Sequence, residues 1–189
     1  AGKPFLTYVL DRLNDAGVKR GILATGYMHE VVNHYFGNRY RDIEIVYSHE
    51  TQPLLTGGAI LQATQYVRGE HFLVLNGDTL FDIDFEALSN HHLSHSASIT
   101  IALREVDDTS RYGAVETKGT QIISFREKAN SCGAGSINGG IYAINKRWLN
   151  HACANMPQKF SFEKDILQTH DGFEGLTFTN YFIDIGVPT

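Results

Sequence analysis

Apolar residues recur with a helical period in the first stretch of the chain. Between Pro4 and Gly17 they lie three or four positions apart, and proline suits a first helical turn as glycine suits a helix end. Short apolar runs then alternate with further stretches of helical period. The pattern predicts helices at residues 4–17, 28–36 and 59–66, and strands at residues 19–25, 43–47 and 72–75. Such an alternation of strands and helices favours a parallel sheet with right-handed crossovers.

The pattern changes after residue 84. Apolar alternation on both sides of Lys118-Gly119 predicts a hairpin with its turn at these two residues. The other expected elements are helices at residues 85–95, 146–151 and 162–168, and strands at residues 98–103, 112–116, 121–127, 136–144 and 176–183. The predicted fold class is α/β, with a Rossmann-like, mixed and mostly parallel sheet flanked by helices.

Composition narrows the class of protein. The 189 residues, 42% of them hydrophobic, suffice for one core and predict a single domain. A net charge of −5 without a basic stripe argues against a nucleic-acid partner. Cys132 and Cys153 form no CxxC motif, so we expect free thiols in a reducing compartment. No apolar run approaches the roughly 18 to 20 residues that span a bilayer, and we expect a cytoplasmic protein without a membrane partner.

Two aspartates follow apolar runs at places where α/β sheets build ligand sites. Asp78 ends FLVLNGD, and Asp184 ends YFID. Each carboxylate can give one oxygen to Mg²⁺ and leave its other positions to water and phosphate. Alternatively, Asp78 caps a turn through Thr79, and Asp184 is an ordinary edge residue. The pattern alone leaves both interpretations open.

Glycines and one charged pair mark further candidate contacts. The pair Gly57-Gly58 lets backbone N–H groups approach an anion or a base edge closely. Glu127-Lys128 can bind sugar hydroxyls and a phosphate, or form a solvated charge run. Gly113 and the run Asn138-Gly139-Gly140 can line a ligand, or mark a β-bulge or a close strand crossing.

The nine histidines give no metal signature in the sequence. His91, His92 and His95 have no carboxylate in the HExxH register, and the other six are scattered. We therefore expect solvated or core histidines.

Six short motifs occur in an order that resembles a known enzyme family. They are LNGDTLFDIDF, SRYGAVE, FREK, INGGIY, KFSFEKDIL and YFIDIGVP. Their order and spacing are similar to those of the sugar-1-phosphate nucleotidyltransferases, and most similar to the guanylyltransferases that act on a heptose 1-phosphate. The resemblance covers essentially the whole chain and implies one domain with the nucleotidyltransferase fold over residues 1–189.

The resemblance implies roles for the matching residues. Asp78 and Asp184 match the two Mg²⁺ ligands of the family. The nucleotide-binding loop corresponds to residues 50–58, with contacts at Glu50, Pro53, Thr56, Gly57 and Gly58. The sugar-phosphate contacts correspond to Gly113, Glu127, Lys128, Asn138, Gly139 and Lys159. Asp78 and Lys128 are the residues implied for catalysis.

The implied reaction is attack by a phosphate oxygen of a sugar 1-phosphate on the α-phosphorus of a nucleoside triphosphate. Pyrophosphate leaves, and the product is a nucleotide sugar for surface polysaccharide. Because the nucleophile is already anionic, Mg²⁺ and cationic side chains need only align the two anions and neutralise charge. The partners are therefore a nucleoside triphosphate, GTP by resemblance, and a heptose or mannose 1-phosphate; self-association into a homo-oligomer is left open.

Base identity is predicted from hydrogen bonding. Guanine presents adjacent N1–H and N2–H₂ donors, which one carboxylate can accept together. We predict that Glu50, three residues before Pro53, reads guanine. The alternative is a solvated loop glutamate.

Two departures from the family pattern affect nucleotide binding. Leu55 stands where the family usually has glycine, and a leucine can narrow the pocket or forbid a backbone conformation that presents N–H groups to the base. The chain also begins after the position of the family's first strand and glycine-rich triphosphate loop, and ends at Pro188-Thr189 where relatives continue into a helix. We expect a domain truncated at both ends, lacking the first strand, with poor or no activity.

Two other functions fit parts of the sequence. The D-x-D triplet at residues 82–84 has the form used by nucleotide-sugar-dependent glycosyltransferases, although a helix N-cap beside a surface charge explains it better. The departures at Leu55 and at the chain start also fit a non-catalytic regulatory homologue that binds a nucleotide sugar. Retention of Asp78, Asp184 and Lys128 argues against that homologue.

Overall fold

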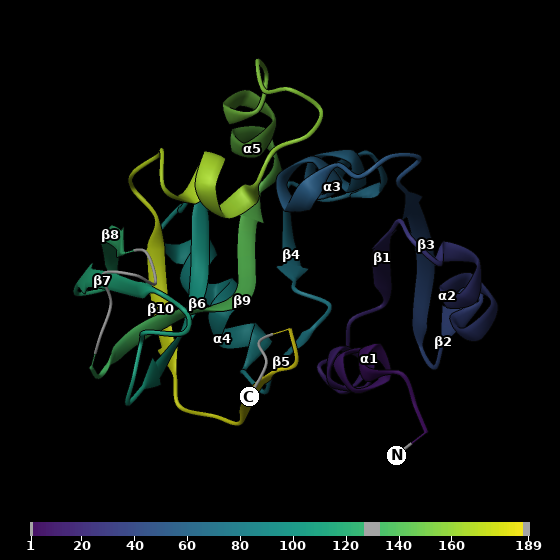
Figure 1. The fold of residues 1–189 in the computed structure, drawn as a ribbon, viewed down its shortest axis with the longest axis horizontal. Coiled ribbons are helices and arrows are strands. Elements are labelled where there is room, and N and C mark those ends of the chain that lie inside the picture. Colours follow the sequence, from purple (N-terminus) through teal and green to yellow (C-terminus); the bar gives the residue numbers. More distant parts are fainter. Residues whose placement is uncertain (1, 127–132, 187–189) are drawn as a thin grey trace. The chain divides into compact units, whose positions relative to one another are not determined.

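The computed structural model describes residues 2–126 and 133–186, and the chain divides into two compact units (Figure 1). The first unit combines Ala1–Val9, His71–Asn145 and His170–Thr189, and the second combines Leu10–Glu70 and Lys146–Thr169. Each unit therefore brings together segments that are far apart in the sequence.

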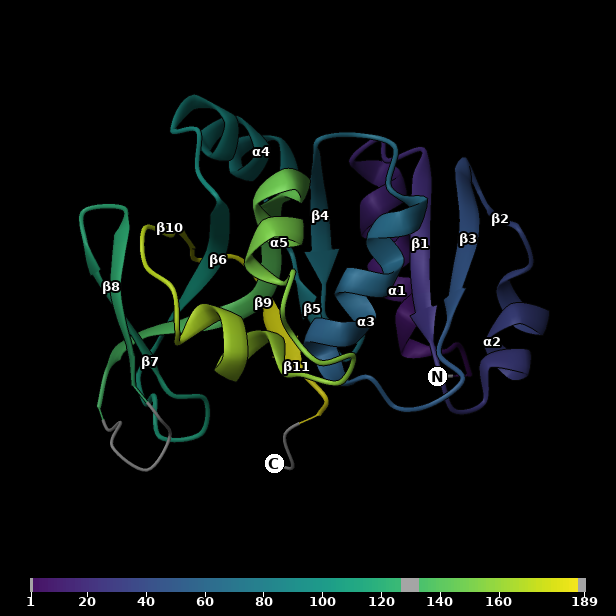
Figure 2. The same cartoon turned by 90° about the horizontal axis from the view of Figure 1, so that it is seen from above.

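The second unit contains a three-stranded sheet with the order β1-β3-β2. Strand β1 (Arg20–Thr25) is parallel to β3 (Ile43–His49), and they lie side by side in Figure 2. The short β2 (Arg39–Tyr40) returns antiparallel along β3. The helical segments are α2 (His29–Phe36), α3 (Leu55–Ala63), η1 (Thr64–Tyr66), α5 (Lys146–Ala152), the π-helix η3 (Glu163–Leu167) and the second part of α1 (Phe5–Asp15). Of the parallel sheet predicted from the first half of the sequence, the pairing of β1 with β3 is confirmed.

The first unit contains a six-stranded sheet with the order β4-β9-β6-β10-β8-β7. In that order, the strands are His71–Leu75, Gly135–Asn145, Ile99–Val106, Glu174–Phe178, Gln121–Arg126 and Ala114–Lys118. Helix α4 (Phe85–Ser94) packs against β6, β9 and β10. Ile137, Tyr142 and Ile144 of β9 are fully buried, which places this long strand at the core of the unit.

Strand direction differs from the sequence expectation. The sheet is mixed as predicted, but among the described strands only β1 with β3 and β6 with β10 pair parallel. Strand β4 pairs antiparallel with β9, and β9 pairs antiparallel with β6 and β7. Local alternation of helices and strands predicts β4 well, but it carries no information about a pairing partner 60 or more positions away along the chain.

The expected closing strand at residues 176–183 is in fact two strands. Strand β10 ends at Phe178, and β11 (Phe182–Asp184) begins after the polar residues Thr179 and Asn180. Strand β11 pairs antiparallel with β5 (Thr79–Phe81), a three-residue strand that the sequence pattern missed because it is too short to show alternation. This small sheet directly follows Asp78 and ends on Asp184.

The D-x-D triplet, the cysteines and the helix lengths also bear on the sequence expectations. The carboxylate of Asp84 accepts a hydrogen bond from the Ala87 N–H at 2.9 Å, so the triplet ends in a helix N-cap as predicted.

Cys153 is a buried free thiol, and burial raises its pKa, which makes it unreactive. Cys132 lies outside the described residues. The helices in the described ranges are too short or too polar to cross a bilayer.

His92 of α4 is a core histidine, as expected. Only 1% of its surface is exposed, and its ring lies 3.0 Å from His71 Nδ1 on one side and 3.0 Å from Thr100 Oγ1 on the other. Burial lowers the pKa of His92 to about 4, and the neighbouring His71 and His91 add to the effect. The folded state therefore holds this imidazole neutral.

Acid should destabilise the protein through His92. The pKa of His92 in the unfolded state is near 6.5. As pH falls from 7 towards 4, the imidazole is therefore protonated in the unfolded state before it is protonated in the folded state, which stabilises the unfolded state. The expected loss is on the order of 2 to 3 kcal/mol across this window. Urea unfolding of the wild type and His92→Gln at pH 7 and pH 4.5 measures it. Equal pH dependence in both proteins would contradict the assignment.

Candidate active site

Asp78 and Asp184 come together at the end of the β5–β11 sheet. Asp184 is paired in register with Thr79, and the Ile185 N–H donates to the Asp78 carbonyl oxygen at 2.9 Å. The Gly186 N–H donates to Asp184 Oδ1 at 2.8 Å. Two strand-end carboxylates thus meet through antiparallel pairing, which the sequence could not specify because no pattern marks β5.

Gly186 lies between the two carboxylates. A Cβ atom at this position would overlap Asp78 Oδ2 and lie 3.3 Å from Asp184 Oδ1, so both oxygens face the same small space. Asp78 Oδ2 and Asp184 Oδ1 therefore lie close to each other on the two sides of this space. Sequence reasoning missed Gly186, although its place in the motif YFIDIGVP was a usable signal. The paired oxygen donors fit a hard divalent cation, whose remaining positions water and phosphate would fill.

Asn138, Gly139 and Gly140 form a bulge in β9. The register with β6 shifts between Ile101 and Leu103, and a Cβ at Gly139 would lie 2.6 Å from the Phe81 ring and 2.7 Å from the Ala102 carbonyl oxygen. Gly140 has a φ of 74°, which favours glycine. The bulge interpretation of the glycine pair is therefore confirmed.

The Asn138 amide is held inside the protein. Its Nδ2 donates to the Tyr142 hydroxyl at 2.8 Å, and its Oδ1 accepts from the Gly140 N–H at 2.9 Å. Gly113 has a φ of 82°, and its N–H donates to the Thr109 carbonyl oxygen at 2.9 Å. These bonds fix the backbone of both segments in the first unit. Roles for Asn138, Gly139 and Gly113 in sugar binding stay predictions.

Glu50, in the second unit, stabilises the loop that follows it through a hydrogen bond between its side chain and the backbone of Leu54. Its Oε2 accepts from the Leu54 N–H at 3.0 Å, and its N–H donates to the Thr25 carbonyl oxygen at 2.8 Å. The side chain is half-buried. The contact holds the loop of residues 50–54 and employs one of the two carboxylate oxygens.

The glycine pair Gly57-Gly58 packs against a protein segment. Helix α3 begins at Leu55, so both glycines lie in its first turn and not ahead of the helix, where the sequence pattern placed them. Their N–H groups donate to the Phe160 carbonyl oxygen at 3.0 and 3.3 Å, which satisfies two of the free donors of a helix start. A Cβ on either glycine would overlap residues 158–160. Contact of this pair with a nucleotide stays a prediction.

Thr56 fastens the same helix start to η3. Its hydroxyl donates to Glu163 Oε2 at 2.8 Å and accepts from the Phe162 N–H at 2.9 Å.

Pro53 and Lys159 are exposed in this unit, and Lys159 makes no ion pair with a described residue. Glu127 and Lys128 lie outside the described residues.

Leu55 adopts a left-handed backbone conformation. Its φ is 61°, in the left-handed region that favours glycine, and its side chain is 51% exposed. The leucine therefore keeps the glycine-type conformation of the loop at a cost in backbone energy.

Glycine should be the better residue at position 55. We expect Leu55→Gly to be more stable than Leu55→Ala by about 1 kcal/mol, because the left-handed conformation costs about 1 to 2 kcal/mol for a residue with Cβ. Thermal unfolding should show this as a difference of about 2–4 °C. The same pair at the exposed Asn90 in α4 should show the opposite order, since alanine favours helices. Identical orders at both positions would contradict strain at Leu55.

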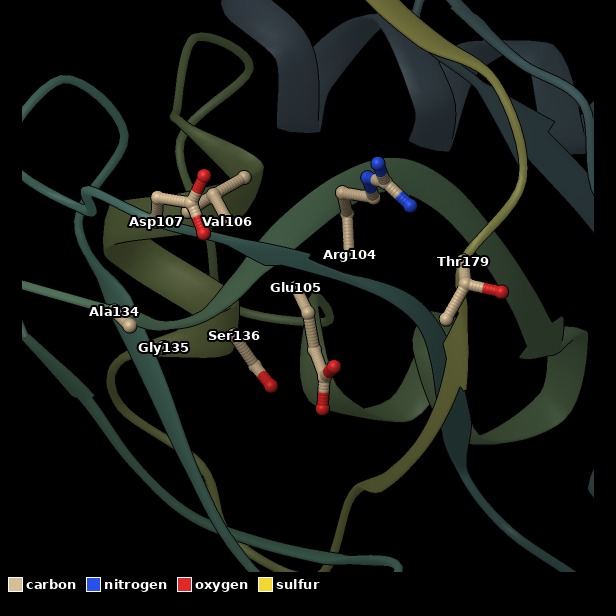
Figure 3. A pocket seen from close by; sticks show the side chains of 8 residues that line it. All are labelled: Arg104, Glu105, Val106, Asp107, Ala134, Gly135, Ser136 and Thr179. Carbon is tan, nitrogen blue, oxygen red and sulfur yellow. The ribbon is translucent and has the colours of Figure 1, made fainter.

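The first unit also contains an open cavity of about 800 Å³, shown in Figure 3. It is lined by Arg104, Glu105, Val106, Asp107, Ala134, Gly135, Ser136 and Thr179. Arg104 and Glu105, neighbours on β6, point to opposite sides of their strand (Figure 3). The lining carries two carboxylates and one cation, which disfavours a phosphate ligand, and it shares no residue with the candidate site.

Comparisons with known proteins identify the family of this chain. A family model described as Nucleotidyl transferase matches residues 1–186. The D-glycero-alpha-D-manno-heptose 1-phosphate guanylyltransferase of Aneurinibacillus thermoaerophilus is 43% identical over 189 residues, which cover 98% of this chain and 81% of that protein. The protein of the same name from Campylobacter jejuni is 40% identical, with 98% and 82% covered.

A solved structure shares the fold. The crystal structure of HddC from Yersinia pseudotuberculosis complexed with GMP-PN matches with a TM-score of 0.86 and 34% identity, over 99% of this chain and 82% of that one. The matches confirm the resemblance drawn from the six motifs, and they confirm a mixed α/β nucleotidyltransferase fold. The chain belongs to the nucleotidyl transferase family of enzymes.

Proposed function

We propose that this protein transfers GMP from GTP to a heptose or mannose 1-phosphate, releasing pyrophosphate and forming a nucleotide sugar. The observation that carries the proposal is the convergence of Asp78 and Asp184 on Gly186 in a chain of this family. The names of the similar proteins support the substrates, because they are guanylyltransferases for a heptose 1-phosphate. The GMP-PN bound to HddC supports a guanine nucleotide.

Asp78 and Asp184 would hold one Mg²⁺ through an oxygen each. When bound, the cation neutralises phosphate charge and orients the triphosphate. The strand pairing holds the backbone next to both aspartates in register, which would bring the two carboxylates together before any substrate arrives. Two unit charges of like sign repel by about 1 kcal/mol at 4 Å in water and by more in a drier site. The Mg²⁺ and the cationic side chains would offset this repulsion between the two phosphate-bearing substrates.

The remaining residues would orient the two substrates. Lys128 would meet the sugar phosphate as a point charge, and Glu127 would accept hydroxyl protons of the sugar. The bulge at Asn138 would present a rigid edge beside the sugar, because its amide is held from both ends. No general base is required, since the attacking phosphate oxygen is already anionic.

A substrate panel tests the proposal. Four nucleoside triphosphates are crossed with heptose, mannose and glucose 1-phosphates, and pyrophosphate release is measured. We expect turnover with GTP and a heptose or mannose 1-phosphate from the full-length protein. A glycosyltransferase would instead transfer sugar from a finished nucleotide sugar without pyrophosphate. Nucleotide-sugar binding without turnover of any pair would contradict the proposal and favour a regulatory protein.

Guanine selection by Glu50 is tested separately. In Glu50→Gln, the amide oxygen can still accept from the Leu54 N–H, so the loop should keep its fold, while the paired acceptor for guanine is lost. We expect the ratio of kcat/KM for GTP over dTTP and UTP to fall at least about tenfold, as losing a hydrogen bond to a charged group implies. Glu30→Gln, on the exposed side of α2, is the matched control. An unchanged ratio would refute guanine reading by Glu50.

A further inference from the structure

A second group of side chains with metal-ligating atoms lies in the first unit and shares no residue with the aspartate pair. His91 is on helix α4, His95 follows one turn later, and Glu174 is the first residue of β10. One ligand atom from each of the three lies within 4.8 Å of the other two. The sequence could not indicate this group because Glu174 follows His95 by 79 positions.

The spacing within the group fits ligands of one ion. His91 Nε2 and Glu174 Oε2 are 3.4 Å apart, and the side chains are only 12% and 18% exposed. A charge-assisted hydrogen bond would be about 2.7–2.9 Å long. Two ligand atoms of a tetrahedral zinc ion, with bonds of about 2.0–2.2 Å, lie about 3.3–3.5 Å apart. The observed separation therefore matches two ligands better than a donor and an acceptor.

The tautomer of His95 is also suited to metal binding. Its Nδ1 lies 2.9 Å from the His91 carbonyl oxygen, and a ring nitrogen at this distance from a carbonyl must carry the proton. Its Nε2 then has the free lone pair that a metal ion requires. A backbone carbonyl behind a ligating imidazole is the usual outer support of such sites. The two imidazole rings stack at 4.0 Å with an interplanar angle of 22°, which holds both rings beside Glu174.

From this geometry we infer that His91, His95 and Glu174 bind one transition-metal ion of the zinc class. Two imidazoles and a carboxylate prefer Zn²⁺, Co²⁺ or Ni²⁺ over Mg²⁺, whereas the Asp78 and Asp184 carboxylates prefer Mg²⁺ or Mn²⁺. Three protein ligands leave one position for water or an outside ligand. The ion ties the end of α4 to the start of β10, and the inference is independent of the proposed catalytic function.

Titration with Co²⁺ or Zn²⁺ tests the inference. The protein is used without a histidine tag, stripped of metal, and held in excess Mg²⁺ so that the aspartate pair is occupied. Isothermal titration and visible Co²⁺ spectra should show one equivalent bound per chain with micromolar or tighter affinity, and Zn²⁺ should raise the unfolding temperature. Absence of binding at micromolar metal would overturn the inference.

Two ligand variants and one control locate the ion. His95→Asn and Glu174→Gln should each weaken binding at least tenfold and abolish the zinc-dependent rise in unfolding temperature. His34→Gln, which removes an exposed imidazole elsewhere, should bind like the wild type. Glu174→Gln keeps a neutral acceptor for His91, so circular dichroism of this variant without metal checks that the fold persists. Unchanged affinity in both ligand variants would overturn the inference.

Discussion

Asp78→Asn will lower kcat/KM for pyrophosphate release by at least about 100-fold. The substitution keeps the size of the side chain but removes the negative charge and one hard oxygen that would hold the metal, and losses of this size follow when a charge-stabilising group is removed. Asp78 lies beside Asp184 through the β5–β11 pairing, so Asp184 alone would supply the remaining carboxylate of the pair. Steady-state assays at saturating and limiting Mg²⁺ measure the loss.

The matched control for this prediction is Asp171→Asn. Asp171 is exposed in the same unit, and its substitution removes the same charge without touching the site, so activity should stay within about twofold, as expected for surface changes. Mn²⁺ binding measured by isothermal titration gives a second readout and should weaken only in Asp78→Asn. A variant at Asp78 that retains full turnover and Mn²⁺ affinity would disprove the metal role.

Gly186→Ala will remove most of the activity by blocking the same space. Its Cβ would overlap Asp78 Oδ2 and approach Asp184 Oδ1 to 3.3 Å, so the carboxylates must separate or the strand end must shift. A misplacement of about 1 Å in a reacting centre costs on the order of 100-fold in rate. We expect a loss of this size together with weaker Mn²⁺ binding, while the unfolding temperature changes little because the residue is exposed.

Gly77→Ala is the control for this second prediction. Gly77 precedes Asp78 and lies outside the left-handed region, and a methyl group added to it would have no described atom within 4 Å beyond its chain neighbours. Its substitution therefore tests whether any methyl group near Asp78 is harmful. Equal losses at Gly77 and Gly186 would show that the effect is general disturbance of the loop and not obstruction between the carboxylates.

Local elements were predictable because their signals are local. Helix α1 follows from apolar spacing after Pro4, and the hairpin of β7 and β8 follows from alternation around Lys118-Gly119. The antiparallel place of β9 was not predictable, since strand pairing depends on the packing of distant segments. The short strand β5 was not predicted because three residues are too few to show alternation, and its pairing with β11 depends on a distant segment.

Candidate site residues were predictable in identity but not in their contacts. The motif order selected Asp78 and Asp184, and the structure brings them together. The glycine pair Gly57-Gly58 lies against the Phe160 carbonyl oxygen, a contact that the sequence did not indicate. A glycine in the sequence reports that space is short; only the fold reveals what occupies that space.

The interleaving of the two units has a consequence for synthesis on the ribosome. Residues 71–145, 75 in number, separate the two segments of the second unit. The N–H groups of Gly57 and Gly58 therefore cannot bond to the Phe160 carbonyl oxygen until the intervening chain has been synthesised. At about 5–20 residues per second, synthesis of this intervening stretch lasts on the order of 4 to 15 s. During that time the start of α3 has free N–H donors and lacks the segment that covers it. The nascent chain should therefore depend on ribosome-associated chaperones more than a protein whose domains are contiguous.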